Sequence, residues 1–168
     1  MTERKTIWKW FWVWEFEKEE RWLNEMAAAG WVLAAVGWCR YVFERCEPGE
    51  YVVRLEMRGS EPLYMDLMAD TGAEYIGRVI QWIYFRRKSE YGPFDLFSDI
   101  DSRVQHLGKI ARALKIVGLA NLLIGALNAV NGAPIGVVNL VLATLLMYGL
   151  GRIQGKQEQL EQERVLHE

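Results

Sequence analysis

Residues 113–150 read ALKIVGLANLLIGALNAVNGAPIGVVNLVLATLLMYGL and contain one charged residue, Lys115. The turn residues Asn131-Gly132-Ala133-Pro134 divide this stretch into two apolar segments, 113–130 and 135–150. A helix that crosses a bilayer needs roughly twenty residues, so we predict a two-helix transmembrane hairpin over 113–151. The alternative is a buried helical hairpin of a soluble protein. A small domain could hardly cover two helices that are apolar on every side.

Basic residues flank the hairpin on one side only. They are Lys109, Arg112 and Lys115 before the first helix and Arg152 and Lys156 after the second. The connecting loop carries no charge. The positive-inside rule therefore predicts a multi-pass protein of the cell membrane with both termini in the cytoplasm.

Small residues and amides recur at three- and four-residue intervals in both apolar segments. The predicted packing residues are Gly118, Asn121, Gly125, Asn128 and Gly132, then Gly136, Asn139, Ala143 and Leu146. Small residues let helices approach closely, and amides can hydrogen-bond across the contact. We interpret the stripes as packing surfaces, within the hairpin or between protomers of a homo-oligomer. The alternative is a polar path through an oligomeric pore or small transporter component.

The N-terminal part has the mixed composition of a soluble domain. An aromatic alternating segment over 7–15 predicts a strand, and residues 17–29 predict a helix that ends at Gly30. Strands are predicted over 31–36, 38–45 and 51–57. The same series recurs after a shift of forty-two positions, which places Trp22 on Tyr64, for example, and Gly30 on Gly72.

The shift predicts an α+β domain built from a tandem β-α-β-β repeat, with one antiparallel sheet and both helices on one face. The predicted inward residues are Phe11, Val13, Tyr41, Phe43, Val53, Leu55, Ile83 and Phe85. The predicted boundaries are 1–90 for this domain, 91–112 for a linker and juxtamembrane helix, 113–151 for the hairpin and 152–168 for a polar cytoplasmic tail. Ser98 or Asp99 is the expected cap of the juxtamembrane helix.

Tryptophan is concentrated on the opposite face of the predicted sheet. The candidate binding face comprises Trp8, Trp10, Trp12, Trp14, Trp38, Arg40, Arg54, Glu56, Trp82 and Tyr84, with Glu44 and Arg86 beside them. An exposed aromatic face of this kind is seldom left without a purpose. It could bind an aromatic or cationic small molecule, a regulator protein or a second copy, or lie against the membrane interface. The linker near Phe94 and Phe97 could instead cover it.

The sequence gives little support for catalysis. It has no glycine-rich phosphate loop, no nucleophile with a plausible histidine and no metal-ligand cluster, so we expect neither an enzyme nor a cofactor. The carboxylates Glu17, Glu19, Glu20 and Glu25 are expected on a solvated helix face. Cys39 and Cys46 are interpreted as reduced structural thiols. A formal net charge of -2 gives no electrostatic case for a nucleic-acid partner.

Several short motifs resemble a bacterial family of membrane proteins, domain-of-unknown-function family 2812. They are Lys9-Trp10-Phe11, the run from Glu20 to Ala27, Gly30-Trp31-Val32-Leu33, Tyr41-Val42-Phe43-Glu44, Glu50-Tyr51, Arg54-Leu55, Glu74-Tyr75-Ile76-Gly77 and Phe97-Ser98-Asp99. Ala73 departs from the pattern, where a tryptophan is expected. The resemblance implies a Gram-positive source, a cytoplasmic N-terminal domain and a gene often placed beside PadR-type regulators. It supplies no catalytic or ligand residues.

The tandem repeat also resembles, at the level of fold alone, GyrI-like domains that bind aromatic and cationic compounds. Two functions are open on the sequence. The first is a non-enzymatic membrane-anchored sensor or adaptor acting through the tryptophan face. The second is the oligomeric pore.

Overall fold

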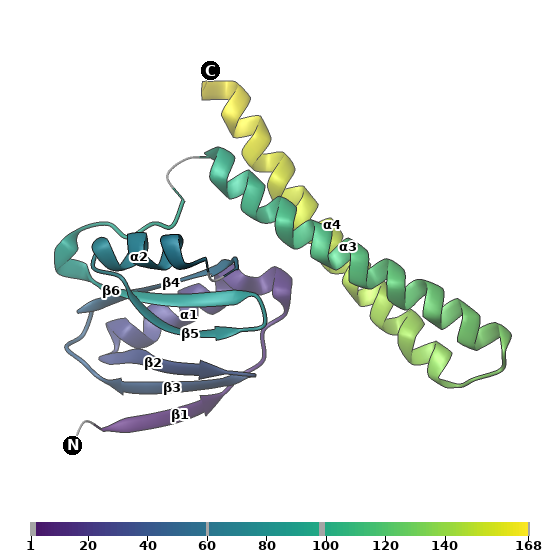
Figure 1. Cartoon of the computed structure of the whole chain (residues 1–168), viewed down its shortest axis with the longest axis horizontal. Helices are drawn as coiled ribbons and strands as arrows, with labels where there is room; N and C mark the ends of the chain where they lie inside the picture. Colours follow the sequence, from purple (N-terminus) through teal and green to yellow (C-terminus); the bar gives the residue numbers. More distant parts are fainter. Residues whose placement is uncertain (1–2, 60, 98–99, 168) are drawn as a thin grey trace. The chain divides into compact units, whose positions relative to one another are not determined.

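The chain forms two compact units, Met1–Leu96 and Phe97–Glu168. The computed structural model describes residues 3–59, 61–97 and 100–167, with side chains described as far as Arg164. Figure 1 shows an α+β unit and a unit of two long helices. The expected cap residues Ser98 and Asp99 lie outside the described residues.

The first unit contains two consecutive strand-helix-strand-strand series. The first series is β1 (Arg4–Trp8), the short 3-10 helix η1 (Val13–Glu15), α1 (Phe16–Ala28), β2 (Trp31–Gly37) and β3 (Arg40–Arg45). The second is β4 (Tyr51–Met57), α2 (Pro62–Asp70), β5 (Glu74–Val79) and β6 (Trp82–Lys88), followed by the 3-10 helix η2 (Ser89–Tyr91). The predicted tandem β-α-β-β repeat is confirmed.

Each series makes its own three-stranded antiparallel sheet, with strand orders β1-β3-β2 and β4-β6-β5. The prediction of one continuous sheet is therefore wrong. The two central strands β3 and β6 begin forty-two residues apart, as the repeat requires. The glycines that end both helices also match, since Gly30 and Gly72 share a φ of 81° and each donates its N–H to the carbonyl three residues earlier.

The two helices do not share one face of a common sheet. Helix α1 lies between the two sheets, while α2 covers the outer face of β4-β6-β5 (Figure 1). Under α2 lies an apolar cluster of Met68, Ala73, Ile83, Phe85 and Phe94. The side of β6 that faces away from this cluster is therefore available to α1.

The predicted inward residues are buried except Val13 and Phe11. Two of the buried ones, Val53 and Leu55, lie on a different face of the sheet from the predicted one. Val13 is 40% exposed, because β1 ends at Trp8 and Val13 belongs to η1; Phe11 is half-buried. Val53 and Leu55 are buried, but Leu55 pairs with Tyr84 across the strands. They therefore point away from α2, opposite to Ile83 and Phe85.

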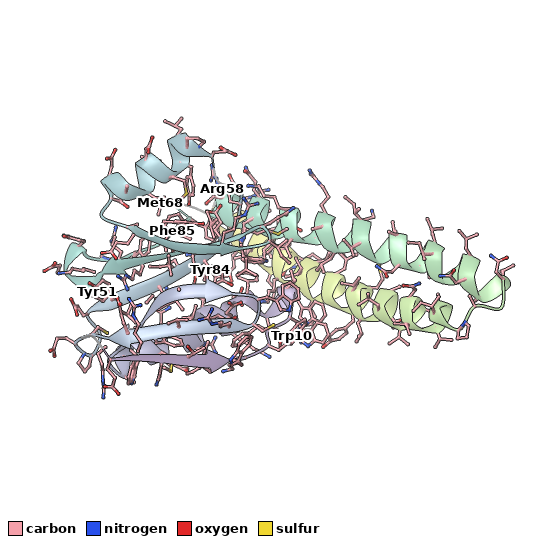
Figure 2. The ribbon with its side chains drawn as sticks, turned by 60° about the horizontal axis from the view of Figure 1, so that its bottom comes forward. Trp10, Tyr51, Arg58, Met68, Tyr84 and Phe85 are labelled. Carbon is pink, nitrogen blue, oxygen red and sulfur yellow. The ribbon has the colours of Figure 1, made fainter. Side chains whose placement is uncertain are left out.

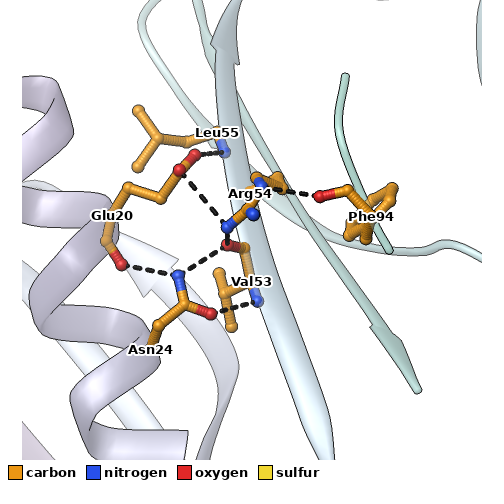
Figure 3. A network of polar contacts seen from close by, with 6 residues as sticks. All are labelled: Glu20, Asn24, Val53, Arg54, Leu55 and Phe94. Carbon is orange, nitrogen blue, oxygen red and sulfur yellow. Dashed lines mark hydrogen bonds and ion pairs between the residues drawn. The ribbon is translucent and has the colours of Figure 1, made fainter. Parts of the chain in front are cut away.

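Helix α1 completes the free edge of β4, which pairs with a strand on only one side. The Asn24 side chain accepts a hydrogen bond from the Val53 N–H (2.9 Å) and donates one to the Val53 carbonyl (2.9 Å). One turn earlier, the Glu20 carboxylate accepts the Leu55 N–H at 3.1 Å (Figure 3). Side chains of the first repeat thus supply hydrogen-bond partners for backbone groups of the second. Every buried strand edge requires such partners.

The second unit is a hairpin of α3 (Ile100–Val130) and α4 (Ile135–His167), of 31 and 33 residues. At about 1.5 Å per residue, each exceeds the ~30 Å hydrocarbon core of a bilayer. Both are long and apolar enough to cross a membrane, and only 17% of the most apolar 18-residue window of each is buried. Large aliphatic side chains such as Leu123 and Leu127 therefore lie on the outside of the hairpin.

Glycines bring the two helices together. A Cβ atom on Gly136 would lie 2.8 Å from the Ala129 backbone nitrogen and 2.9 Å from the Gly125 carbonyl oxygen. A Cβ on Gly118 would lie 2.5 Å from Cε of Met147, which is the mobile end of a side chain. Among the described glycines of the hairpin, Gly136 beside the loop is the one whose Cβ position lies within 3.0 Å of backbone atoms, so no other residue type fits there without a shift.

Some of the remaining predicted packing residues lie at the contact between the two helices, and one lies in the turn that joins them. Ala143 is 2% exposed, whereas Asn121 donates to its own helix at the Val117 carbonyl (2.9 Å). The Cβ atoms of Asn128 and Asn139 lie within 3.1 Å of the Cβ positions built on Gly136 and Gly125, respectively. In the part of the chain that the structure describes, Gly132 has no atom within 4 Å of its Cβ position. Its φ of 70° assigns it to the turn instead.

We expect Gly136→Ala to destabilise the hairpin by about 1–3 kcal/mol, because the added methyl group meets backbone that cannot rotate away. The measurement is the thermal loss of helical circular dichroism of the full chain in detergent. Gly151→Ala is the matched control, since the described atoms leave its Cβ position open within 4 Å. Equal melting temperatures for the two variants would contradict the packing.

We expect Asn24→Ala to destabilise the α+β unit by about 1–3 kcal/mol for each Val53 backbone group that loses its partner. All eight tryptophans precede residue 97, so thermal melts followed by tryptophan emission report this unit alone. Glu25→Ala, on the exposed side of the same helix, should change stability by no more than about 0.5 kcal/mol. A loss at Glu25 as large as that at Asn24 would rule out the capping role.

Candidate functional site

Four tryptophans from two separate segments meet at one end of the α+β unit. The ring centroids of Trp10 and Trp38 are 5.9 Å apart, those of Trp10 and Trp12 5.4 Å, and those of Trp12 and Trp14 5.0 Å. We call Trp10, Trp12, Trp14 and Trp38 the tryptophan cluster. Figure 2 shows Trp10 at the end of the sheets away from Tyr51.

The chain reaches this cluster by leaving the sheet. The last bond that joins β1 to its neighbour is donated by the Lys9 N–H to the Cys39 carbonyl (3.0 Å), and η1 begins four residues later. The predicted strand over 7–15 is therefore wrong beyond Trp8, and its strict alternation does not hold. Trp14 is 6% exposed, whereas Trp8, Trp10 and Trp38 are 70%, 53% and 61% exposed.

Other residues of the predicted face lie elsewhere. Trp82 stacks on Phe16 with a centroid distance of 5.4 Å, and Tyr84 is buried at 4% exposure against α1. Arg54 and Glu56 point to the opposite side of the sheet, where Glu56 accepts a hydrogen bond from the Tyr64 hydroxyl (2.7 Å). The predicted common face is wrong for two reasons: the register of β4 on β6 places Arg54 and Glu56 on the face of Phe85 and Ile83, and α1 covers Tyr84 on the other face.

The linker does not cover the tryptophans through Phe94. That side chain packs into the cluster under α2, and its carbonyl accepts a hydrogen bond from Arg54 Nε at 2.8 Å. Arg40 remains beside the exposed tryptophans, because it is the cross-strand partner of Trp8. Its side chain is exposed.

A buried carboxylate, Glu19, lies between the two repeats. Its Oε1 atom accepts hydrogen bonds from the hydroxyls of Tyr41 in β3 and Tyr84 in β6, both at 2.7 Å. Glu19 is 8% exposed, so its expected place on a solvated helix face is wrong. The spacing of Phe16, Glu19, Leu23 and Ala27, all buried in α1, was the available signal.

Burial raises the pKa of the Glu19 carboxyl above its ordinary value, and the two tyrosine hydroxyls lower it in part. Burial and the neighbouring carboxylate raise the pKa of both Tyr41 and Tyr84, so each hydroxyl remains a donor. The described residues place no Lys or Arg in an ion pair with Glu19. The group can therefore hold the two repeats together without a neutralising cation.

A second polar link joins the two sheets through Arg86 of β6. Its guanidinium donates to Glu44 of β3 at 2.7 Å, to Glu74 of β5 at 2.7 Å and to the Leu33 carbonyl of β2 at 3.1 Å. Glu44 and Arg86 are thus structural ion-pair partners. Among the described residues, no group of three or more His, Cys, Asp or Glu side chains could hold a metal ion.

The family model described as "Protein of unknown function (DUF2812)" matches residues 15–119. The chain belongs to this family. No curated protein and no solved structure matches it.

The region shared with the DUF2812 family begins at the end of η1 and ends within α3. It contains the whole of α1 and the Glu19–Tyr41–Tyr84 link. Trp8, Trp10, Trp12 and Trp14 precede it, and Trp38 lies inside it. In this DUF2812 chain, the tryptophan cluster therefore combines a segment outside the family match with a hairpin inside it.

The raised pKa of Glu19 predicts a pH dependence of stability. The folded chain binds the proton more tightly than the unfolded chain, so this group's contribution is greatest below the ordinary carboxyl pKa and falls as the pH rises through the raised value. Glu19→Gln stays neutral while its Oε1 can accept both tyrosine hydroxyls. We expect the variant's melting temperature, relative to the parent, to be highest at neutral pH and to decline on acidification.

Melts followed by tryptophan emission between about pH 4 and pH 8 provide the test. Glu25→Gln, at an exposed position of α1, is the control and should show a constant difference. Glu19→Ala should be destabilised at every pH, by about 1–3 kcal/mol for each tyrosine hydroxyl left unpaired. A pH-independent difference for Glu19→Gln would contradict the titration.

Proposed function

We propose that this chain is a non-enzymatic, membrane-anchored sensor or adaptor that binds through its exposed tryptophans. The observation that carries the proposal is the exposure of Trp8, Trp10 and Trp38, each above one half, on a domain joined to two apolar helices. The candidate occupants are an aromatic or cationic small molecule, a regulator protein and a second copy of the chain.

Membrane anchoring is supported by the outer surface of the hairpin. Aliphatic side chains such as Leu123, Leu127 and Val137 are each about two thirds exposed, which favours lipid over water as their surroundings. The small residues are used between the helices, as in other membrane-embedded pairs. Because the basic residues lie at the helix ends remote from the uncharged loop at 131–134, the proposal places both termini in the cytoplasm.

Binding through the tryptophans is supported by the cost of leaving them in water. A tryptophan side chain offers 150–250 Å² of surface on burial, and aromatic residues dominate the energetics of interfaces. The domain has apolar interiors in which other aromatic residues, such as Phe43 and Phe85, are fully buried. Three tryptophans left outside these interiors are therefore typical of a recognition surface.

A non-enzymatic role is supported by the use that the fold makes of its buried carboxylates. Glu19 is held by Tyr41 and Tyr84, and Glu56 by Tyr64. These hydrogen bonds join elements of the fold, and none of the three tyrosines needs to move for the domain to be complete. The function is then one of recognition.

The pore alternative is less well supported by the geometry. Gly118, Gly125 and Gly136 meet the other helix of the same hairpin, so these stripes serve packing within one chain. The Asn121 amide is hydrogen-bonded to its own helix. The homo-oligomer stays a prediction for which the mass of the purified chain in detergent is the direct measurement.

Neighbouring tryptophans give the sharpest test of the proposed surface. Trp10→Ala combined with Trp38→Ala should lower the stability by only about 1 kcal/mol, the worth of the lost aromatic pairs. Trp14→Ala, the matched buried control, should cost about 3–5 kcal/mol. The double variant should also weaken recognition by about 2 kcal/mol or more, roughly thirtyfold.

Recognition is measured on the full chain in detergent by two probes: the response of tryptophan emission to tetraphenylphosphonium, an aromatic cation, and the concentration dependence of the oligomeric mass. The double variant should lose at least one of these responses. If it melts as poorly as Trp14→Ala, the cluster is part of the core and the proposal loses its support.

A further inference from the structure

The surface around the exposed tryptophans is basic. Residues 8–13 and 36–40 comprise the end of β1, the segment after it and the β2–β3 turn, and they contain Lys9 and Arg40 but no acidic residue. Arg4 and Lys5 lie at the other end of β1, where Arg4 pairs with Glu44 at 3.7 Å. Arg40 is exposed and lies across the strands from Trp8. The Lys9 ammonium lies 4.3 Å from the ring centroid of Trp22, so it is fixed close to the point where the chain leaves the sheet.

The exposed tryptophans lie where strands end. Trp8 is the last residue of β1, Trp10 follows the last bond of β1, and Trp38 occupies the tip of the β2–β3 hairpin, beside Cys39 with its φ of 53°. An exposed indole ring combines an apolar body with an N–H that can donate to a polar partner. This is the chemistry that enriches tryptophan at the boundary between lipid headgroups and acyl chains.

Attachment to the hairpin makes the membrane the surface that the exposed tryptophans meet most often. Two helices in the bilayer hold the attached domain close to the membrane, which converts lipid binding into an intramolecular event at high effective concentration. Contacts too weak to bind a free domain to a membrane are then sufficient to dock the attached one. Basic residues near an anionic surface are attracted to it, so Lys9 and Arg40 favour a membrane that contains anionic lipid.

We propose that Trp8, Trp10 and Trp38, with Lys9 and Arg40, dock the α+β domain onto the surface of an anionic bilayer. This inference rests on the proposed function, since it names the partner of the same surface on a membrane-anchored domain. Docking places the three indoles at the headgroup level and the two basic groups against lipid phosphates. The docked domain has its tryptophans covered, and release from the surface makes them available to another ligand.

The full chain reconstituted into vesicles tests this docking. Lipids brominated in their acyl chains quench tryptophan emission at close approach, and all eight tryptophans lie before residue 97, so the signal reports the domain and not the hairpin. We expect strong quenching in vesicles of brominated phosphatidylglycerol. Quenching should fall at least twofold in brominated phosphatidylcholine and on raising the salt concentration.

Arg40→Glu is the first variant, because it reverses one charge and removes no fluorophore. It should lower quenching in the anionic vesicles and leave the melting temperature unchanged within a few degrees. Trp8→Ser combined with Trp38→Ser should abolish most of the quenching. Trp31→Phe is the matched control for the loss of a fluorophore, since Trp31 lies at the other end of β2 under Lys5 and Arg45. Because this variant loses an unquenched tryptophan, its quenched fraction should not fall below the parental value.

Equal quenching in the two lipids, or equal quenching in the parent and Arg40→Glu, would overturn the inference. So would unchanged quenching in the Trp8/Trp38 variant. Should any of these occur while the Trp10/Trp38 variant still loses its response to tetraphenylphosphonium or its self-association, the proposed function stands and only the lipid partner is wrong. If the Trp10/Trp38 variant loses neither of these two responses, both the proposed function and the docking inference are wrong.

Discussion

The unpaired edge of β4 is the constraint on which the rest of the α+β unit depends. Its outward N–H and carbonyl groups are not paired with another strand, and a buried edge without partners costs more than the domain can sustain. The Asn24 amide and the Glu20 carboxylate of α1 supply those partners. Because these side chains belong to the first repeat and the edge to the second, the two repeats become one domain.

The same insertion of α1 explains why a carboxylate is buried. The helix presents one apolar side to β3, and at Glu19 this side also faces β6, so hydroxyls from both sheets reach the same oxygen atom. The desolvation of Glu19 lowers stability, whereas the two hydrogen bonds fix the register of one repeat against the other.

Insertion of α1 also determines what is left for binding. One side of the second sheet is used by α1 and the other by α2, so Tyr84 is buried and Trp82 is half-buried against Phe16. The exposed tryptophans of the described residues lie at the end of the first sheet, where the chain passes from β1 to η1. If this end of the domain is the recognition surface that we propose, the basic Lys9 and Arg40 beside the exposed tryptophans favour an anionic partner such as a lipid surface.

The sequence by itself determined the features that depend on neighbours along the chain. The forty-two-residue repeat, the helix-ending Gly30 and Gly72, the two apolar helices and the small-residue contact at Gly136 follow from local conformation and periodicity. Only the tertiary structure decided that there are two sheets, that Glu19 is buried and that Trp14 is interior while Trp10 is exposed. Periodicity shows which residues share a face of an element, but burial depends on which other element covers that face, and here the covering helix comes from the neighbouring repeat.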